Sequence, residues 1–108
     1  MADSFQVLVM REAQLAYAGG TEAVTLIHCS VEGATVRTPT GFPGMPVTLL
    51  IVLPNQSLLI CPSTVTGIRT MHGQPVADIA FDPMPIATES RLGRWLRDQE
   101  RHPSPSLV

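Results

Sequence analysis

The sequence HCSVEG at residues 28–33 decides the fold, because it has the composition of a tight turn between two strands. An alternating segment, residues 22–27, leads into the turn, and a short segment, residues 34–37, leads out of it. The Ser30 hydroxyl can bond local backbone groups, and Gly33 allows positive φ. Such a turn can present backbone N–H groups to an anion, which makes it the first candidate for a binding site.

The other strands follow from turn signals that divide the chain up to Phe81 into short segments. We expect strands at residues 5–17, 22–27, 34–37, 47–53, 57–69 and 75–81, and a loop at residues 39–44. The fifth segment should be one strand or two, interrupted at Pro62, because proline cannot donate to a strand ladder. Short strands at regular spacing predict a mainly β protein built as a small antiparallel barrel.

The pattern changes after Phe81, where residues 88–101 have helical spacing. Thr88 is the expected N-cap, and Glu89 lies next to the positive end of the helix. The buried stripe should consist of Leu92, Trp95, Leu96 and Gln99, and the outer row of Arg91, Arg94, Arg97 and Arg101. That outer row is either a solvated face or a surface for an acidic partner.

Composition sets the outer limits for the protein. The chain has 108 residues, of which 44% are hydrophobic and 15% charged, so we expect one folded domain over residues 1–101. Residues 102–108 have the composition of a disordered tail. The net charge of −2 argues against a general nucleic-acid binder, which needs a broad basic surface.

Two further features bear on location. The longest apolar run, residues 49–53, is far too short to cross a bilayer. Residues 1–4 lack a charged start followed by an apolar run, so no signal peptide is predicted. We therefore expect a cytoplasmic protein.

Three segments together resemble the PilZ domain of bacteria. Ser30 and Gly33 match the end of the turn motif of that family, which is Asp or Asn, any residue, Ser, two residues, Gly. The segment GMPVTLLIVLP, residues 44–54, is similar to the glycine, spacer, alternating strand and Leu-Pro of the family. The segment VADIAF, residues 76–81, is similar to the strand that ends in Phe before the helix.

The resemblance covers residues 5–101 and implies a fold and a ligand. The implied fold is a six-stranded antiparallel barrel with a C-terminal helix, and the implied ligand is the second messenger cyclic di-GMP. Its phosphates and guanine edges accept paired hydrogen bonds, which suits arginine. Arg11, His28, Ser30 and Gly33 are the candidate ligand-binding residues in this sequence.

Two departures from the family pattern affect the ligand site. The Arg-x-x-x-Arg pair of the family should fall close to Ser4 and Leu8, and no arginine precedes Arg11. His28 stands where the family has Asp or Asn, and a neutral imidazole cannot copy a carboxylate. Each lost charged hydrogen bond removes roughly 1.5–3 kcal/mol, so together the losses would remove most of a micromolar affinity.

Each candidate residue also has a structural interpretation. Ser30 and Gly33 can simply hold the turn, and His28 can be a partly exposed turn histidine. Arg11 can reach a phosphate or pair with Glu12 or Glu22, and we favour a surface ion pair of little energetic weight.

Metal and enzyme functions are weaker hypotheses. His28, Cys29, Cys61 and His72 are of ligand type, but their spacing fits no common zinc pattern. Catalysis by Ser30 or Cys29 with His28 is also disfavoured. His28 and Cys29 are neighbours on a strand and point to opposite faces, and His28 and Ser30 share a face but have no evident third group. We therefore expect no metal, no cofactor and no catalytic residue.

The sequence thus predicts a non-enzymatic PilZ-like adaptor in a bacterial signalling or motility system. It would act by contacting another protein, with weak or no binding of cyclic di-GMP. The alternative is a true cyclic di-GMP receptor that uses the turn at residues 28–33 together with Arg11 or the arginines of a partner.

Overall fold

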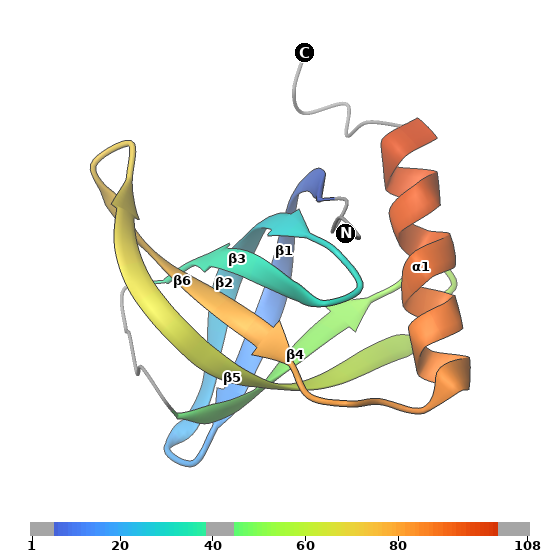
Figure 1. Ribbon diagram of the computed structural model, residues 1–108, viewed down its shortest axis with the longest axis horizontal. Helices are drawn as coiled ribbons and strands as arrows, with labels where there is room; N and C mark the ends of the chain where they lie inside the picture. The colour runs from blue at the N-terminus through green and yellow to red at the C-terminus, as the bar shows by residue number, and fades with distance from the viewer. Residues whose placement is uncertain (1–5, 39–44, 102–108) are drawn as a thin grey trace.

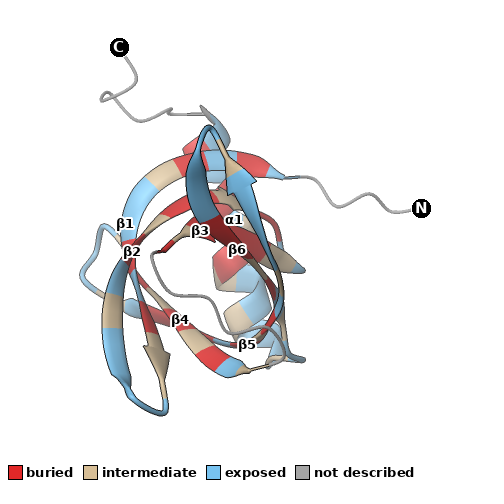
Figure 2. Ribbon diagram, turned by 90° about the vertical axis from the view of Figure 1, so that its left-hand side faces the viewer, coloured by how far each residue is buried: buried red, intermediate tan, exposed pale blue. Residues whose placement is uncertain are grey.

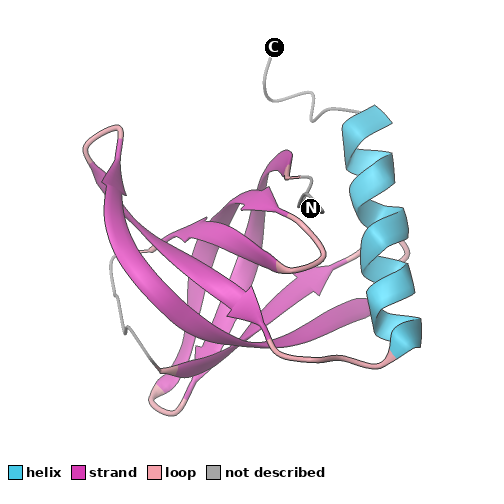
Figure 3. Cartoon of the chain, viewed as in Figure 1, coloured by secondary structure: helices cyan, strands magenta, loops and turns pink. Residues whose placement is uncertain are grey.

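The structure is a computed structural model that describes residues 6–38 and 45–101. Six strands form one closed antiparallel barrel, and a single helix stands beside it (Figure 1, Figure 3). The elements are β1 Val7–Tyr17, β2 Gly20–Cys29, β3 Gly33–Arg37, β4 Pro46–Val52, β5 Leu58–Met71, β6 Gln74–Phe81 and α1 Ile86–Arg101. The predicted six-stranded barrel with a C-terminal helix is confirmed.

The order of strands around the barrel is β1-β2-β3-β6-β5-β4. β6 lies between β3 and β5, so the last strand of the chain joins the two groups of earlier strands, β1-β2-β3 and β4-β5. β1 and β4 close the barrel over the three pairs Gln14↔Leu50, Leu15↔Leu49 and Ala16↔Thr48. The turn between β2 and β3 is therefore one part of a continuous wall, and its position depends on β6.

One hydrophobic core fills the barrel and extends to α1. Leu26, Val36, Leu49 and Leu59 are fully buried or nearly so, because alternate side chains of each strand point inward. The buried stretches of the strands and the inner side of α1 face one another (Figure 2). The predicted helical stripe is correct, because Leu92, Trp95, Leu96 and Gln99 are all buried.

The predicted interruption at Pro62 is wrong, because β5 runs through it as one strand. Pro62 is paired with Thr48 of β4, and its carbonyl accepts a hydrogen bond of 2.8 Å from Asp82 N. The backbone nitrogen of a strand residue points to the same side as its carbonyl. On that side β6 has already ended at Phe81, opposite Ser63, so the missing donor breaks no ladder bond.

The helix begins at Ile86, and the predicted N-cap at Thr88 is wrong. Glu89 N donates to the Pro85 carbonyl at 3.0 Å, which is the first bond of the helix. Pro85 is compatible with this position, just before the helix, because its fixed φ of about −65° is also allowed in the extended region. Glu89 still lies in the first turn, where the helix dipole favours a carboxylate.

The loop predicted at residues 39–44 and the tail predicted at residues 102–108 lie outside the described residues, as does Phe5 at the expected start of the first strand. Among the residues that the structure describes, no helix is long and apolar enough to cross a bilayer.

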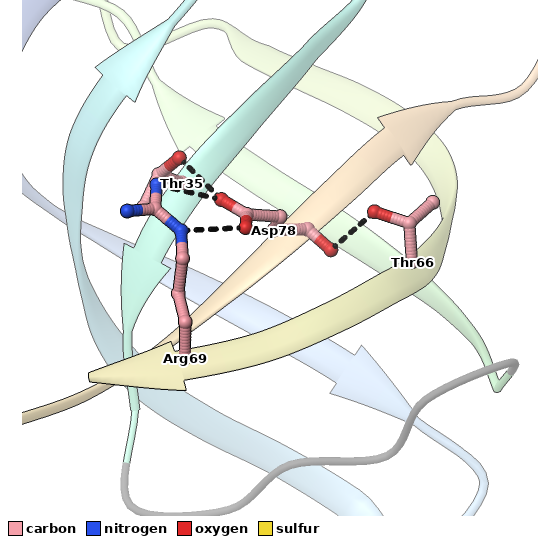
Figure 4. A network of polar contacts seen from close by, with 4 residues as sticks. All are labelled: Thr35, Thr66, Arg69 and Asp78. Atoms are coloured by element: carbon pink, nitrogen blue, oxygen red, sulfur yellow. Dashed lines mark hydrogen bonds and ion pairs between the residues drawn. The ribbon is translucent and has the colours of Figure 1, made fainter. Parts of the chain in front are cut away.

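A polar network on the outer face joins β3, β5 and β6 (Figure 4). The Asp78 carboxylate accepts hydrogen bonds from Thr35 Oγ1 at 2.8 Å and from Arg69 Nε and Nη2 at 2.8 and 3.1 Å. The Asp78 carbonyl accepts a further bond of 3.1 Å from Thr66 Oγ1. The Arg69 hydrogen bonds, with help from Thr35, hold the pKa of Asp78 below its ordinary value, although partial burial opposes this.

This lowered pKa predicts a stability loss in acid. Below the ordinary aspartate pKa of about 3.9 the unfolded chain takes up a proton before the folded chain does. Stability from Asp78 is therefore complete above that pH and is lost as the pH falls toward the folded value. We expect thermal melts between pH 7 and pH 2 to show a steeper acid decline for the wild type than for Asp78→Asn.

Glu100→Gln is the control, since it removes one carboxylate from an exposed position on α1. It should keep the acid decline of the wild type. Parallel curves for the wild type and Asp78→Asn would refute the role of the network.

Candidate ligand-binding turn between β2 and β3

Ser30 organises the turn between β2 and β3 through its hydroxyl. Ser30 Oγ accepts hydrogen bonds from the backbone N–H groups of Glu32 and Gly33 at 3.1 and 3.3 Å. Ser30 N donates to the Gly33 carbonyl at 2.9 Å, and Ser30 itself is buried. The N–H groups at positions 32 and 33, which the sequence suggested for an anion, are therefore bonded within the turn.

Gly33 is needed for a different reason from the one predicted. Its φ is not in the positive range where glycine is favoured. A Cβ at this position would lie 2.3 Å from the Ile79 carbonyl oxygen and 3.3 Å from the Ala80 Cα. The backbone of β6 thus passes directly against Gly33. Phe81 N donates to the Glu32 carbonyl at 2.8 Å and holds the two backbones together.

We therefore expect Gly33→Ala to lower the free energy of unfolding by about 1–3 kcal/mol, because the added methyl group must push β6 aside. Urea denaturation followed by circular dichroism measures this change.

Gly67→Ala is the matched control for this prediction. It adds the same methyl group to β5, at a glycine with no atom within 4 Å of the added Cβ and no positive φ. Its free energy of unfolding should stay close to that of the wild type or rise slightly. Equal losses for both variants would contradict the close-approach explanation.

His28 lies on β2, half-buried, between Leu8 of β1 and Thr35 of β3. A register irregularity between Leu26 and His28 interrupts the alternation of the strand. As a result Cys29 joins the core, while His28 lies beside Leu8, whose side chain is 50% exposed. His28 and the position expected for the second family arginine therefore do lie next to each other on the barrel.

Arg11 points to the helix instead of the turn. Arg11 Nε donates to Gln99 Oε1 on α1 at 2.8 Å. The expected surface ion pair with Glu12 or Glu22 is wrong, since within the described part of the chain Arg11 has no carboxylate partner. Glu22 accepts its hydrogen bond from Thr38 Oγ1. In the described residues, no hydrogen bond joins Arg11 to His28, Ser30 or Gly33, so the structure does not bring the four candidates together.

A shallow hollow of about 370 Å³ lies beside the turn. Its lining includes Val31 and three carboxylate residues, Glu32, Asp82 and Glu89. Glu32 comes from the turn, Asp82 from the end of β6 and Glu89 from the first turn of α1. This lining repels phosphates, because like charges at close range raise the energy of a bound anion.

The two cysteines are buried free thiols. Burial, with a smaller effect of neighbouring Cys61, raises the pKa of Cys29 to about 12, against a hydrogen bond to the Ser30 backbone that lowers it. Burial raises the pKa of Cys61 to about 11. Only the thiolate is a strong nucleophile or metal ligand, so both side chains suit the core and not a reactive site.

The four residues considered for zinc do not form a site. Cys29 and Cys61 point into the core, whereas His72 lies in the two-residue turn between β5 and β6, with φ of 53°. In residues 6–38 and 45–101, no group of three or more His, Cys, Asp or Glu side chains could hold a metal ion.

Sequence reasoning missed two contributors to this region. The sequence places Gln99 only on the buried stripe, yet its amide oxygen is the partner of Arg11. The sequence does not connect Glu32 with Asp82 and Glu89, because they come together only when β6 leads into α1 beside the turn. The signal available in the sequence for this acidic hollow is that each of these residues stands next to the end of a strand or of the helix.

No protein-family model matches the sequence, and no curated protein matches it either. Solved structures do match. The PilZ domain of CeSA from a cellulose-synthesizing bacterium is 20% identical, with a TM-score of 0.70 over 90% of this chain and 99% of that domain. The PilZ domain of YcgR from Escherichia coli, solved with c-di-GMP, is 16% identical, with a TM-score of 0.74 over 93% and 92%.

A longer protein matches as well. The Bacillus subtilis inhibitor of motility, MotI or DgrA, is 13% identical, with a TM-score of 0.79 over 96% of this chain. The chain spans 54% of that protein. At these identities the likeness concerns the fold, and the chain has the fold of a PilZ domain.

Proposed function

We propose that this chain is a PilZ-type signalling domain that acts as a non-enzymatic adaptor, through contact with another protein and with little or no binding of cyclic di-GMP. The observation that carries the proposal is the acidic hollow of Glu32, Asp82 and Glu89 beside the turn. A ligand with two phosphates needs cations there. The fold, shared with PilZ domains solved with c-di-GMP, supports the link to such signalling.

Three further features support loss of the ligand site. The turn N–H groups at Glu32 and Gly33 are bonded by Ser30. Arg11 is held by Gln99 on the helix. Leu8 and His28 stand at two of the three positions where the family pattern has charged or polar groups, and they are paired across β1 and β2.

Isothermal titration with cyclic di-GMP tests the proposal. We expect no binding heat from this chain at ligand concentrations that saturate the PilZ domain of YcgR, which serves as the positive control. Saturable heat at low micromolar affinity would reject the proposal that the chain acts as an adaptor with little or no binding of cyclic di-GMP.

A restored variant sharpens the same test. Ser4→Arg, Leu8→Arg and His28→Asp together return the charged groups of the family pattern, and the last two changes face each other across β1 and β2. We expect this triple variant to gain measurable affinity, since each charged hydrogen bond contributes roughly 1.5–3 kcal/mol. The same triple change with Leu8→Gln in place of Leu8→Arg is the matched control and should bind more weakly.

The second candidate function is a cyclic di-GMP receptor that uses Arg11. Arg11 favours it because its guanidinium is exposed and, among the described residues, only Nε is bonded. This receptor predicts that Arg11→Ala abolishes binding heat, whereas Arg97→Ala, the removal of another exposed arginine, leaves it unchanged. Under the adaptor proposal, Arg11→Ala instead lowers the free energy of unfolding by about 0.5–1.5 kcal/mol through loss of the bond to Gln99.

A further inference from the structure

A second hollow lies on another part of the molecule, between α1 and the turn that joins β4 to β5. Its volume is about 240 Å³. Arg91, Arg94, Trp95 and Asp98 line it from the helix, and residues 53–55 and Ser57 line it from the turn. We call this hollow the basic groove, since it holds two guanidinium groups and one carboxylate on a chain whose net charge is −2.

Arg91 is held in a fixed position in the basic groove. Arg91 Nη2 donates to Ser57 Oγ at 3.1 Å and to the Leu58 carbonyl at 3.4 Å. Ser57 Oγ in turn donates to Asn55 Oδ1 at 2.6 Å, and Asn55 Oδ1 also accepts from Ser57 N at 3.1 Å. Both Arg91 contacts come from Nη2. They therefore orient the guanidinium group, and its other two nitrogens can still donate hydrogen bonds to a ligand.

The guanidinium groups of the basic groove lack a carboxylate partner. In the described part of the chain neither Arg91 nor Arg94 has a carboxylate oxygen within 4.0 Å. Asp98 lies four residues after Arg94 on the helix, but it too is outside this distance. Two adjacent arginines therefore retain charge that an external carboxylate can neutralise. The indole of Trp95 and the side chains of Leu53 and Pro54 give the same groove an apolar wall.

An apolar strip continues from the basic groove along the outer face of β4 and β5. It consists of Val52, Leu58 and Ile60, which are 67%, 42% and 52% exposed. Val52 and Leu58 are cross-strand partners, and Ile60 lies on the same face as Leu58 two residues on. Leu58 joins the strip to the groove, because its carbonyl accepts the bond from Arg91.

From this arrangement we infer that the basic groove and the apolar strip together dock an acidic peptide segment of a partner protein. One Asp or Glu of the segment binds between Arg91 and Arg94, and its aliphatic neighbours cover Val52, Leu58 and Ile60. This inference rests on the proposed adaptor function and supplies the chemistry of its partner. Exposed aliphatic residues next to arginine and tryptophan are the composition of protein–protein binding sites.

The size of the groove favours a side chain over a nucleotide. Sites for small molecules usually measure roughly 300–1,000 Å³ and enclose most of the ligand. A groove of about 240 Å³ beside an exposed strip instead accommodates one acidic side chain of a longer segment.

Selection of short random peptides by display against the whole 108-residue protein tests this inference. We expect enrichment of sequences with Asp or Glu next to aliphatic residues. Binding of a selected peptide, measured by fluorescence polarisation, should weaken by roughly 10-fold or more in Arg94→Gln, since a charged hydrogen bond is lost. Arg91→Gln should weaken it as well, but Arg91 also holds the turn, so Arg94→Gln is the cleaner variant.

Arg97→Gln is the matched control, because it removes the same charge from an exposed position on the same helix outside the groove. It should change the affinity less than about 2-fold, which is within roughly 0.4 kcal/mol. The indole signal of Trp95 gives an independent readout, since Trp95 is the only tryptophan of the chain. It should shift saturably with the peptide and not with the counterpart in which Glu is replaced by Gln.

Enriched peptides without acidic residues, equal affinity of Arg94→Gln and the wild type, or an unchanged Trp95 signal would each overturn the inference. Displacement of the peptide by inorganic phosphate would also overturn it in favour of a simple anion site. Cyclic di-GMP heat in the titration above would reject the adaptor function alone, because peptide binding that depends on Arg94 would still stand.

Discussion

The packing of one apolar stripe of α1 against the barrel core is the constraint on which the other features depend. Leu92, Trp95 and Leu96 belong to the same buried cluster as the inward residues of the strands. Burial of such side chains contributes roughly 1.5–3 kcal/mol each, which fixes the helix in one orientation. That orientation brings Gln99 to Arg11 at one place and Arg91 to the β4–β5 turn at another.

The fold could be predicted from the sequence because its main signals are local. Alternating strands, turn residues and a helical stripe each depend on neighbours within a few positions, and all point to the same barrel. The two local errors, at Pro62 and at the start of the helix, have separate causes. The helix begins earlier than Thr88 because the Pro85 carbonyl accepts its first backbone bond. Whether a proline is tolerated depends on which side of the strand has a partner, and β6 ends beside Pro62.

The candidate site could be predicted only in part, because its chemistry depends on long-range contacts. Ser30 and Gly33 do form the turn, but the need for glycine comes from the β6 backbone at Ile79, 46 positions away in sequence. The partner of Arg11 is 88 positions away. The periodicity of a sequence carries no information on such contacts, so the sequence groups Arg11 with the turn or with nearby carboxylates and not with Gln99.

The burial of both thiols has a practical consequence for the search for a partner. Cys29 and Cys61 are the only cysteines of the chain, and neither exposes its side chain while the barrel is closed. Maleimide reagents would therefore label the folded protein only at a cysteine introduced on the surface. A photoactivatable cross-linker attached through such a residue would be confined to one chosen position, so the surface that a partner covers can be mapped without replacing either native cysteine.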